Sequence, residues 1–280
     1  MREIQSFLFV ACLFLASCNA NSTQKPDVLL VSTTSTQDSG LLDVLLPAFT
    51  TRTGYHVQLV AVGSGQALKI GEQGDADVIL LHSPAAEEEF VANGFGIDRR
   101  LVMHNDFVIV GPASDPAGIR GKTPLDALKN ISASRVIFVT RGDDSGTHVK
   151  ELTLWQDAGL NPAGEDWYLE TGQGQGATLS IASEKGGYAL TDRGTFLTYR
   201  SNVGLEILVE GDPFLLNVYH VITVNPEKFP NINLEGAKAF AAFITSDEGQ
   251  SIIAEFGVEE HGQPLFFPDA GKSEEELGIP

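Results

Sequence analysis

The chain has 280 residues, 42% of them hydrophobic, which suffices for one large or two medium globular domains. Its formal net charge is −19 at pH 7, and only 18 of its residues are Lys or Arg. Binding to nucleic acid requires clustered positive charge that neutralises phosphates, so this composition excludes nucleic acid as an expected partner.

The start of the chain has the layout of an export signal. A charged beginning, an apolar run over residues 7–16 and a polar stretch ending at Pro26 are typical of a secretory signal. The run is too short to be a stable membrane anchor. It ends in the tetrapeptide LASC, which resembles the lipobox of bacterial lipoproteins, where cleavage before the cysteine is followed by lipidation of its thiol. We therefore expect residues 1–18 to be a signal peptide with a lipobox, Cys18 to carry the lipid, and residues 19–26 to be a tether. An ordinary signal peptide is the alternative.

The two cysteines of the chain are Cys12 and Cys18. Cys12 lies inside the apolar run and would be removed with the signal. With Cys18 lipidated, no disulfide can form and no thiol remains for a metal site or a nucleophile.

From Asp27 onward, apolar strands alternate with amphipathic helices. The pattern predicts strand–helix pairs over residues 27–34 and 35–54, 55–63 and 64–74, and 76–82 and 83–94. Such alternation is typical of a parallel sheet with crossover helices. A further strand over 105–112 ends at a Gly-Pro break, a plausible exit from a first lobe.

A second series of the same kind follows. Helices are predicted over 124–131, 145–158 and 176–186, with strands over 135–140 and 166–172. A long strand over 215–226 can then return the chain to the first lobe, where residues 234–257 form an amphipathic helix broken at Ser246-Asp247. We predict a two-lobed α/β fold, each lobe a mainly parallel sheet flanked by helices, with two crossing strands as the hinge. Lobe 1 would comprise residues 27–110 and 215–280, and lobe 2 residues 111–214.

Four of the strand-to-helix turns are rich in Gly, Ser and Thr. They cover residues 32–37, 63–67, 141–148 and 172–179. In open α/β sheets such turns lie at the carboxyl ends of the strands, so we expect them to share one cleft. Each precedes a helix, whose free N–H groups and positive dipole end favour an anion. A small tetrahedral oxyanion suits this set of donors.

Arg141 supplies the only full positive charge in these four turns. We expect it to contact the anion. An ion pair with Asp143 or Asp144 is the competing role, and either carboxylate could also orient the guanidinium. Ser35 and Ser64, taken singly, could equally be helix caps.

The turn sequences resemble a known family. STTSTQDSGLL, GSGQAL with GDADVILLHSPAAE, RGDDSGTHVKE and GQGQGATL are similar to the tungstate-binding proteins of bacterial tungstate ABC importers, over about residues 28–257. The wider superfamily includes molybdate-, sulfate- and phosphate-binding proteins with a similar two-lobed, hinge-closing fold. The segment RGDDSGT also resembles a loop of phosphate-binding proteins.

The resemblance implies an oxyanion carrier that delivers its ligand to an ABC permease with an ATPase subunit. It implies ligand contacts from Thr34, Ser35, Ser64, Arg141, Ser145, Gly146, Thr147 and, from the fourth turn, Thr178. The family commonly has three threonines before the serine of the first turn, and here the first of these places is Ser32.

The choice of anion depends on Asp143. Phosphate carries a proton at neutral pH and benefits from a carboxylate acceptor, whereas tungstate, molybdate and sulfate present acceptors only. If Asp143 points into the cleft, phosphate is plausible; if it braces Arg141 or caps the helix, a dianion without protons is favoured. No residue separates tungstate from molybdate, so that preference comes from the resemblance.

Two other classes of function compete. Ser145 and His148 could suggest a hydrolase, but their spacing does not aim the imidazole at the hydroxyl and the motif is not G-x-S-x-G, so we expect no enzyme. The six histidines lack metal-ligand spacing, and we expect no metal and no cofactor. An anion sensor that signals to a membrane partner remains an alternative.

His82, at a strand end, could line the cleft or serve in packing.

Overall fold

A computed structural model describes residues 25–143 and 145–278. The predicted signal peptide, the lipidation site Cys18 and the tether up to residue 24 lie outside the described residues. Within the described part, no helix combines the length and apolar character needed to cross a membrane.

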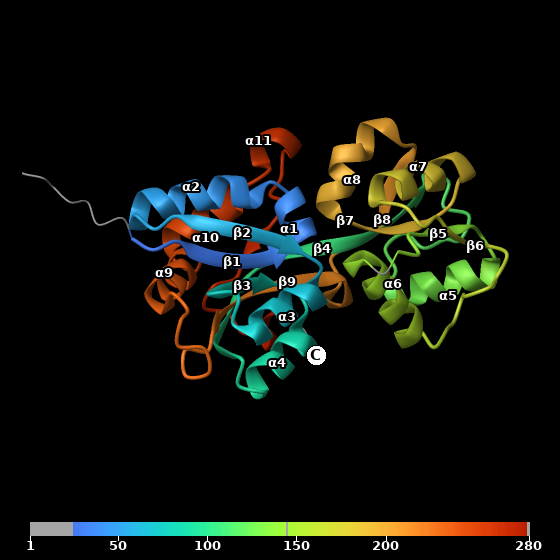
Figure 1. Cartoon of the computed structure of the whole chain (residues 1–280). Coiled ribbons are helices and arrows are strands. Elements are labelled where there is room, and N and C mark those ends of the chain that lie inside the picture. The colour runs from blue at the N-terminus through green and yellow to red at the C-terminus, as the bar shows by residue number, and fades with distance from the viewer. Residues whose placement is uncertain (1–24, 144, 279–280) are drawn as a thin grey trace, which may run out of the picture.

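The first group of elements is built on a sheet covered by helices on both faces (Figure 1). Its strands follow the order β10-β4-β9-β3-β1-β2. They are β1 (Val28–Thr33), β2 (Val57–Val62), β3 (Val78–Leu81), β4 (Gly96–Pro112), β9 (Leu216–Val224) and β10 (Phe267–Pro268). Alternate side chains of β1 and β3 enter two apolar clusters on opposite faces, which is why both strands are nearly continuous apolar runs.

Helices complete these two clusters. One face packs against α2 (Leu41–Thr53), α9 (Leu234–Ile244) and α10 (Asp247–Glu255). The other packs against α3 (Ser64–Gln73) and α4 (Pro84–Ala92). The short α1 (Thr34–Asp38) follows β1, and α11 (Val258–His261) follows α10.

The second group of elements surrounds the C-terminal part of β4, from Phe107 onward (Figure 1). β7 (Ala189–Asp192) and β8 (Leu205–Val209) pair with β4, while β5 (Phe138–Thr140) and β6 (Tyr168–Glu170) form a parallel pair beside them. The helices of this group are α5 (Pro124–Ser134), α6 (Gly146–Asp157), α7 (Gln175–Lys185) and α8 (Arg193–Tyr199). The 3-10 helices found among the described residues are η1 (Arg200–Asn202), η2 (Pro213–Leu215) and η3 (Glu275–Leu277).

The two groups are joined through β4 and β9. β4 pairs with β9 as far as Asp106, opposite Leu216, and with β7 from Phe107 onward. This change of partner falls close to the predicted crossing points at residues 110 and 215. The lobe boundaries themselves stay predictions.

The α/β class is confirmed by the observed fold, but four details differ from the sequence predictions. The sheet is mixed, because β4 and β9 run antiparallel to their neighbours while β1, β2 and β3 are parallel. β4 begins at Gly96, nine residues earlier than the predicted start at 105, since Asp98-Arg99-Arg100 form an irregularity that interrupts the apolar alternation. The predicted helix over 35–54 is two helices, because Gly40 has a φ of 81°. The strand β8 was not predicted.

Candidate anion-binding site

Thr33 organises the first turn. It is the N-cap of α1, and its Oγ1 accepts a hydrogen bond from Thr36 N at 3.2 Å. The same oxygen lies 3.0 Å from Ser35 Oγ and 2.6 Å from Thr36 Oγ1. Thr34 and Ser35, the predicted ligand contacts, are exposed at the start of the helix. The sequence predictions did not include Thr33, although its place as the last residue of a strand before a helix is the signal for an N-cap.

Ser32, where the family commonly has threonine, is directed away from this turn. It is fully buried, and its hydroxyl donates to the carbonyl of Leu80 on β3 at 2.8 Å. The hydroxyl therefore ties two strands together.

The second turn lies beside the first. β1 and β2 pair in register up to Thr33 opposite Val62, so the residues that follow both strands are neighbours. Gly63 is the N-cap of α3, and Ser64 is its first residue and is partly exposed. Ser64 thus begins a helix but does not cap it.

The third turn is braced by Asp143. Arg141 Nε and Nη2 donate to Asp143 Oδ2 at 3.0 and 2.5 Å, and Ser145 N donates to Oδ1 at 3.2 Å. Burial raises the pKa of Asp143, but hydrogen bonds from the Ser145 side chain and from Arg141 outweigh it and hold the pKa below its usual range. Asp143 is therefore an ionised brace of the loop. Asp144, the other candidate partner of Arg141, lies outside the described residues.

This turn leads directly into α6. Ser145 is the N-cap and accepts from His148 N at 3.4 Å, while Gly146 and Thr147 open the helix. Gly142 has a φ of 64°, which glycine adopts without strain. The backbone thus turns sharply between Arg141 and the helix start, and places both at one edge of the second group.

The fourth turn is hydrogen-bonded to the third. Gly172 N donates to Arg141 O at 2.7 Å, and Thr171 N donates to Thr140 O at 3.0 Å. Thr178 is buried, and its hydroxyl donates to Gly174 O at 3.2 Å and lies 3.1 Å from Thr171 Oγ1. These bonds give Thr178 a structural role at the start of α7, and its contact with an anion stays a prediction.

Tyr199 of α8 covers the start of α7. A Cβ atom on Gly176 would lie 2.3 Å from Tyr199 Cζ, so the ring rests directly on the glycine backbone. The sequence predictions did not single out Tyr199. No local pattern marks it, because it reaches this turn only through the packing of α8.

His82 links the two groups of elements. It follows β3 directly, and its Nε2 lies 3.2 Å from Thr33 Oγ1 and 3.3 Å from Ser35 Oγ. On the other side, a Cβ atom on Gly146 would be 3.5 Å from His82 Cε1, which is van der Waals contact. The ring packs on Tyr219 of β9, with the centroids 4.8 Å apart. His82 therefore has the packing role considered from the sequence, and its part in lining the cleft stays a prediction.

The four turns are thus neighbours. Strand pairing joins the first to the second, backbone hydrogen bonds join the third to the fourth, and His82 joins the first to the third. They present hydroxyls, helix N-termini and one guanidinium. Within the described part of the chain, no group of three or more His, Cys, Asp or Glu is placed to hold a metal ion.

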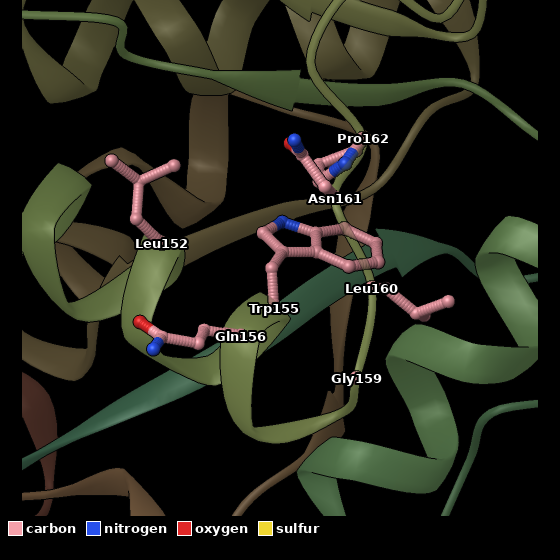
Figure 2. Close-up of a pocket in the computed structure, with 7 residues that line it drawn as sticks. All are labelled: Leu152, Trp155, Gln156, Gly159, Leu160, Asn161 and Pro162. Carbon is pink, nitrogen blue, oxygen red and sulfur yellow. The ribbon is translucent and has the colours of Figure 1, made fainter.

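Two surface hollows lie elsewhere. One of about 430 Å³ lies at the C-terminal end of α6, where Trp155 and Pro162 are among its lining residues (Figure 2). The other lies around α10 and α11 and includes Val44 and Glu259. Neither includes a residue predicted to bind the anion.

The chain matches a family model described as a PBP superfamily domain, over residues 20–248. The tungstate-binding protein TupA of Peptoclostridium acidaminophilum is 53% identical over 251 residues, which cover 89% of this chain and 87% of that protein. TupA of Campylobacter jejuni is 43% identical, covering 84% of this chain and 88% of that protein. The solved structure of the tungstate-binding protein TupA from Desulfovibrio alaskensis G20 superposes with a TM-score of 0.84 at 46% identity, covering 88% of this chain and 100% of that chain.

A mixed α/β fold with helix-starting turns gathered between two groups of elements is the architecture of a solute-binding protein. These relatives are named as binding proteins, in agreement with the expectation that the chain is not an enzyme. The chain belongs to the PBP superfamily and, within it, to the family of tungstate-binding proteins named TupA.

Proposed function

We propose that the chain is an exported binding protein that captures tungstate and delivers it to an ABC permease served by an ATPase subunit. The names of the TupA relatives support tungstate as the ligand. A solved structure described as the tungstate ABC transporter from Geobacter sulfurreducens, which is 48% identical with a TM-score of 0.70, supports an ABC transporter as the setting. Tungstate is then the cargo of the protein and not a cofactor. Export and attachment to the membrane through Cys18 are part of the proposal and rest on the N-terminal sequence.

The observation that carries this proposal is the position of Asp143. Both of its carboxylate oxygens accept hydrogen bonds within the third turn, from Arg141 and from Ser145 N. A protonated anion such as phosphate would gain from a carboxylate that accepts its proton, whereas a fully deprotonated anion needs donors alone. The braced Asp143 therefore favours tungstate, molybdate or sulfate over phosphate. The preference for tungstate among these rests on the relatives.

The proposed ligand contacts are the residues that the turns bring together: Thr34, Ser35, Ser64, Arg141, Ser145, Gly146 and Thr147, with Thr178 the least supported by its surroundings. Contacts from both groups of elements imply that the two lobes, divided at residues 110 and 215, close around the anion.

Calorimetric titration of the full-length protein with tungstate, molybdate, sulfate and phosphate tests the proposal. We expect tungstate and molybdate to bind more tightly than sulfate, and phosphate to bind least. Preferential binding of phosphate, or no binding of any of the four anions, would contradict the proposed function.

A further inference from the structure

The charges around the four turns are nearly balanced before an anion arrives. Arg141 is paired with Asp143, so this pair contributes little net positive charge. Tungstate carries two negative charges, and burial of uncompensated charge is costly. Helix N-termini and hydroxyls offset this cost with partial charges only. An additional positive charge at the turns would therefore favour binding.

His82 is a side chain at this site that can acquire such a charge. Its Nε2 already lies within hydrogen-bond distance of two hydroxyls of the first turn, and its Cε1 lies near Gly146 at the start of α6. An imidazolium at this point would face the first and third turns together. The other histidine of the turns, His148, is buried on α6.

Residues of β4 and β9, the two strands that join the lobes, hold the opposite side of the His82 ring. The Asn217 side chain hydrogen-bonds the imidazole, and Asn217 Nδ2 also donates to Asn105 Oδ1 at 2.8 Å and to Tyr219 Oη at 3.1 Å. Asn105 and Asn217 lie opposite each other on β4 and β9. The orientation of His82 is thus fixed by the two strands that join the lobes, and its Nε2 is directed at the first turn.

The groups that face His82 leave it neutral in the free protein at neutral pH. Burial lowers its pKa, and Glu87 of α4, the Asn217 side chain and Asp192 at the end of β7 raise it only in part. Tyr219 faces it from β9, and the paired Arg141 and Asp143 lie in the adjoining third turn. A dianion bound next to Nε2 would stabilise the imidazolium and raise the pKa.

We propose that His82 takes up a proton when the anion binds, so that Nε2 donates to the Thr33 and Ser35 hydroxyls while the Ser35 hydroxyl donates to the anion. The inference rests on the proposed function. The proton comes from the solvent and forms an N–H bond at His82, and no other covalent bond changes. His82 is thus a positioning residue that also supplies charge.

The consequence is a defined pH dependence of affinity. The pKa of His82 is higher in the complex than in the free protein, so affinity rises as pH falls through the interval between the two values, by at most about tenfold per pH unit. Above this interval His82 is neutral in both states, and affinity no longer depends on it.

Calorimetry of the full-length protein with sodium tungstate, in several buffers of different ionisation enthalpy near pH 7, measures the protons taken up. We expect wild type to take up a substantial fraction of one proton per anion, and His82→Gln, which keeps a hydrogen-bonding group but cannot be charged, to take up none and to bind about tenfold more weakly. His56→Gln is the matched control, since His56 is exposed and precedes β2 at the opposite end of the sheet; it should behave as wild type.

The outcomes separate this inference from the proposed function. Tungstate binding by wild type without proton uptake would overturn the role of His82 and leave the proposed function intact. Proton uptake that persists in His82→Gln, or that is lost only in His148→Gln, would also overturn the role of His82 and leave the proposed function intact. If wild type binds no tungstate, the proposed function fails and the role of His82 fails with it. The wild-type measurement decides the matter even if His82→Gln does not fold.

Discussion

Arg141 and Asp143 form an ion pair within one turn, with Nε and Nη2 of the guanidinium both donating to Asp143 Oδ2. The arginine side chain is 21% exposed, so it is held in place but not enclosed. The ion pair with Asp143, which was the alternative to ligand binding in the sequence analysis, therefore exists. It fixes the guanidinium of Arg141 at the edge where the turns meet.

Arg141→Ala should weaken tungstate binding by about tenfold to more than a hundredfold. A hydrogen bond to a charged partner contributes roughly 1.5–3 kcal/mol, and each 1.4 kcal/mol corresponds to a factor of ten in affinity. Arg141→Lys should recover only part of the loss, because an ammonium keeps the charge but not the planar fork. Calorimetry gives the affinities. A variant with a lower melting temperature and unchanged affinity would mean that Arg141 only holds the loop.

Closure around the anion should be visible in solution. The predicted contacts come from both groups of elements, and β4 and β9 join these groups. Small-angle scattering of the full-length protein should therefore give a smaller radius of gyration with saturating tungstate than without it. An unchanged radius, at concentrations where calorimetry shows full binding, would argue against a hinge between the lobes.

The meeting of the turns could be predicted because it follows from local rules. Ser145 precedes a helix and becomes its N-cap. The first two turns follow the neighbouring ends of the parallel strands β1 and β2, and the other two follow those of β5 and β6. The side-chain directions could not be predicted in this way. Asp143 had two chemically reasonable roles, and only the folded loop shows that its carboxylate faces Arg141 and Ser145 N.

Local sequence rules also could not predict features that depend on contacts between distant segments. His82 could be placed at a strand end, but its packing on Tyr219 depends on β9 lying beside β3. The early start of β4 was hidden by Asp98 and the two arginines that follow, which are polar residues within an extended strand. Sequence patterns therefore defined the turns, and tertiary packing decided which side chains meet there.

Cys18→Ser should abolish lipid labelling of the protein in a bacterial host. The thiol of Cys18 is the predicted attachment point, and Cys12 lies inside the apolar run that would be removed. Metabolic labelling with a lipid precursor measures the effect, with Cys12→Ser as the matched control that should still be labelled. Equal labelling of wild type and Cys18→Ser would show that the tetrapeptide LASC is not a lipobox.

Asp106→Ala should destabilise the junction between the two groups of elements. Asp106 accepts hydrogen bonds from Arg193 Nε and Nη2 at 2.8 and 2.6 Å, and the two side chains are only 9% and 12% exposed. Arg193 Nη2 also donates to Glu210 Oε2 at 2.7 Å, but the Glu210 side chain is 55% exposed. Without Asp106 the buried guanidinium keeps only this solvated partner, so the loss should be at most roughly 3 kcal/mol.

Urea unfolding measures this loss, and an exposed pair provides the control. Arg120 and Glu206 lie 2.7 Å apart, but both are about half exposed, at 51% and 53%. Glu206→Ala should therefore change the free energy of unfolding by less than about 1 kcal/mol. Similar losses in the two variants would show that burial of the Asp106–Arg193 pair does not matter.

Glu151→Gln should remove a pH dependence from the stability of the second group. Glu151 is buried on α6, and its Oε1 accepts from Tyr168 Oη at 2.7 Å and from Trp155 Nε1 at 3.1 Å. Burial raises the pKa of Glu151 from 4.5 to about 7, although these hydrogen bonds partly oppose the rise. The folded protein thus binds this proton more tightly than the unfolded chain does. Its contribution to stability is fully present below about pH 4.5 and is lost as pH rises to about 7.

Gln keeps an acceptor for Tyr168 and Trp155 but cannot ionise, so the stability of the variant relative to wild type should increase between about pH 5 and pH 8. The increase should reach at most about 3 kcal/mol, at 1.36 kcal/mol for each pKa unit. Urea unfolding of both proteins at the two pH values measures it, and Glu184→Gln, at an exposed position of α7, should show no such change. A difference between Glu151→Gln and wild type that stays constant with pH would mean that Glu151 titrates normally in the folded protein.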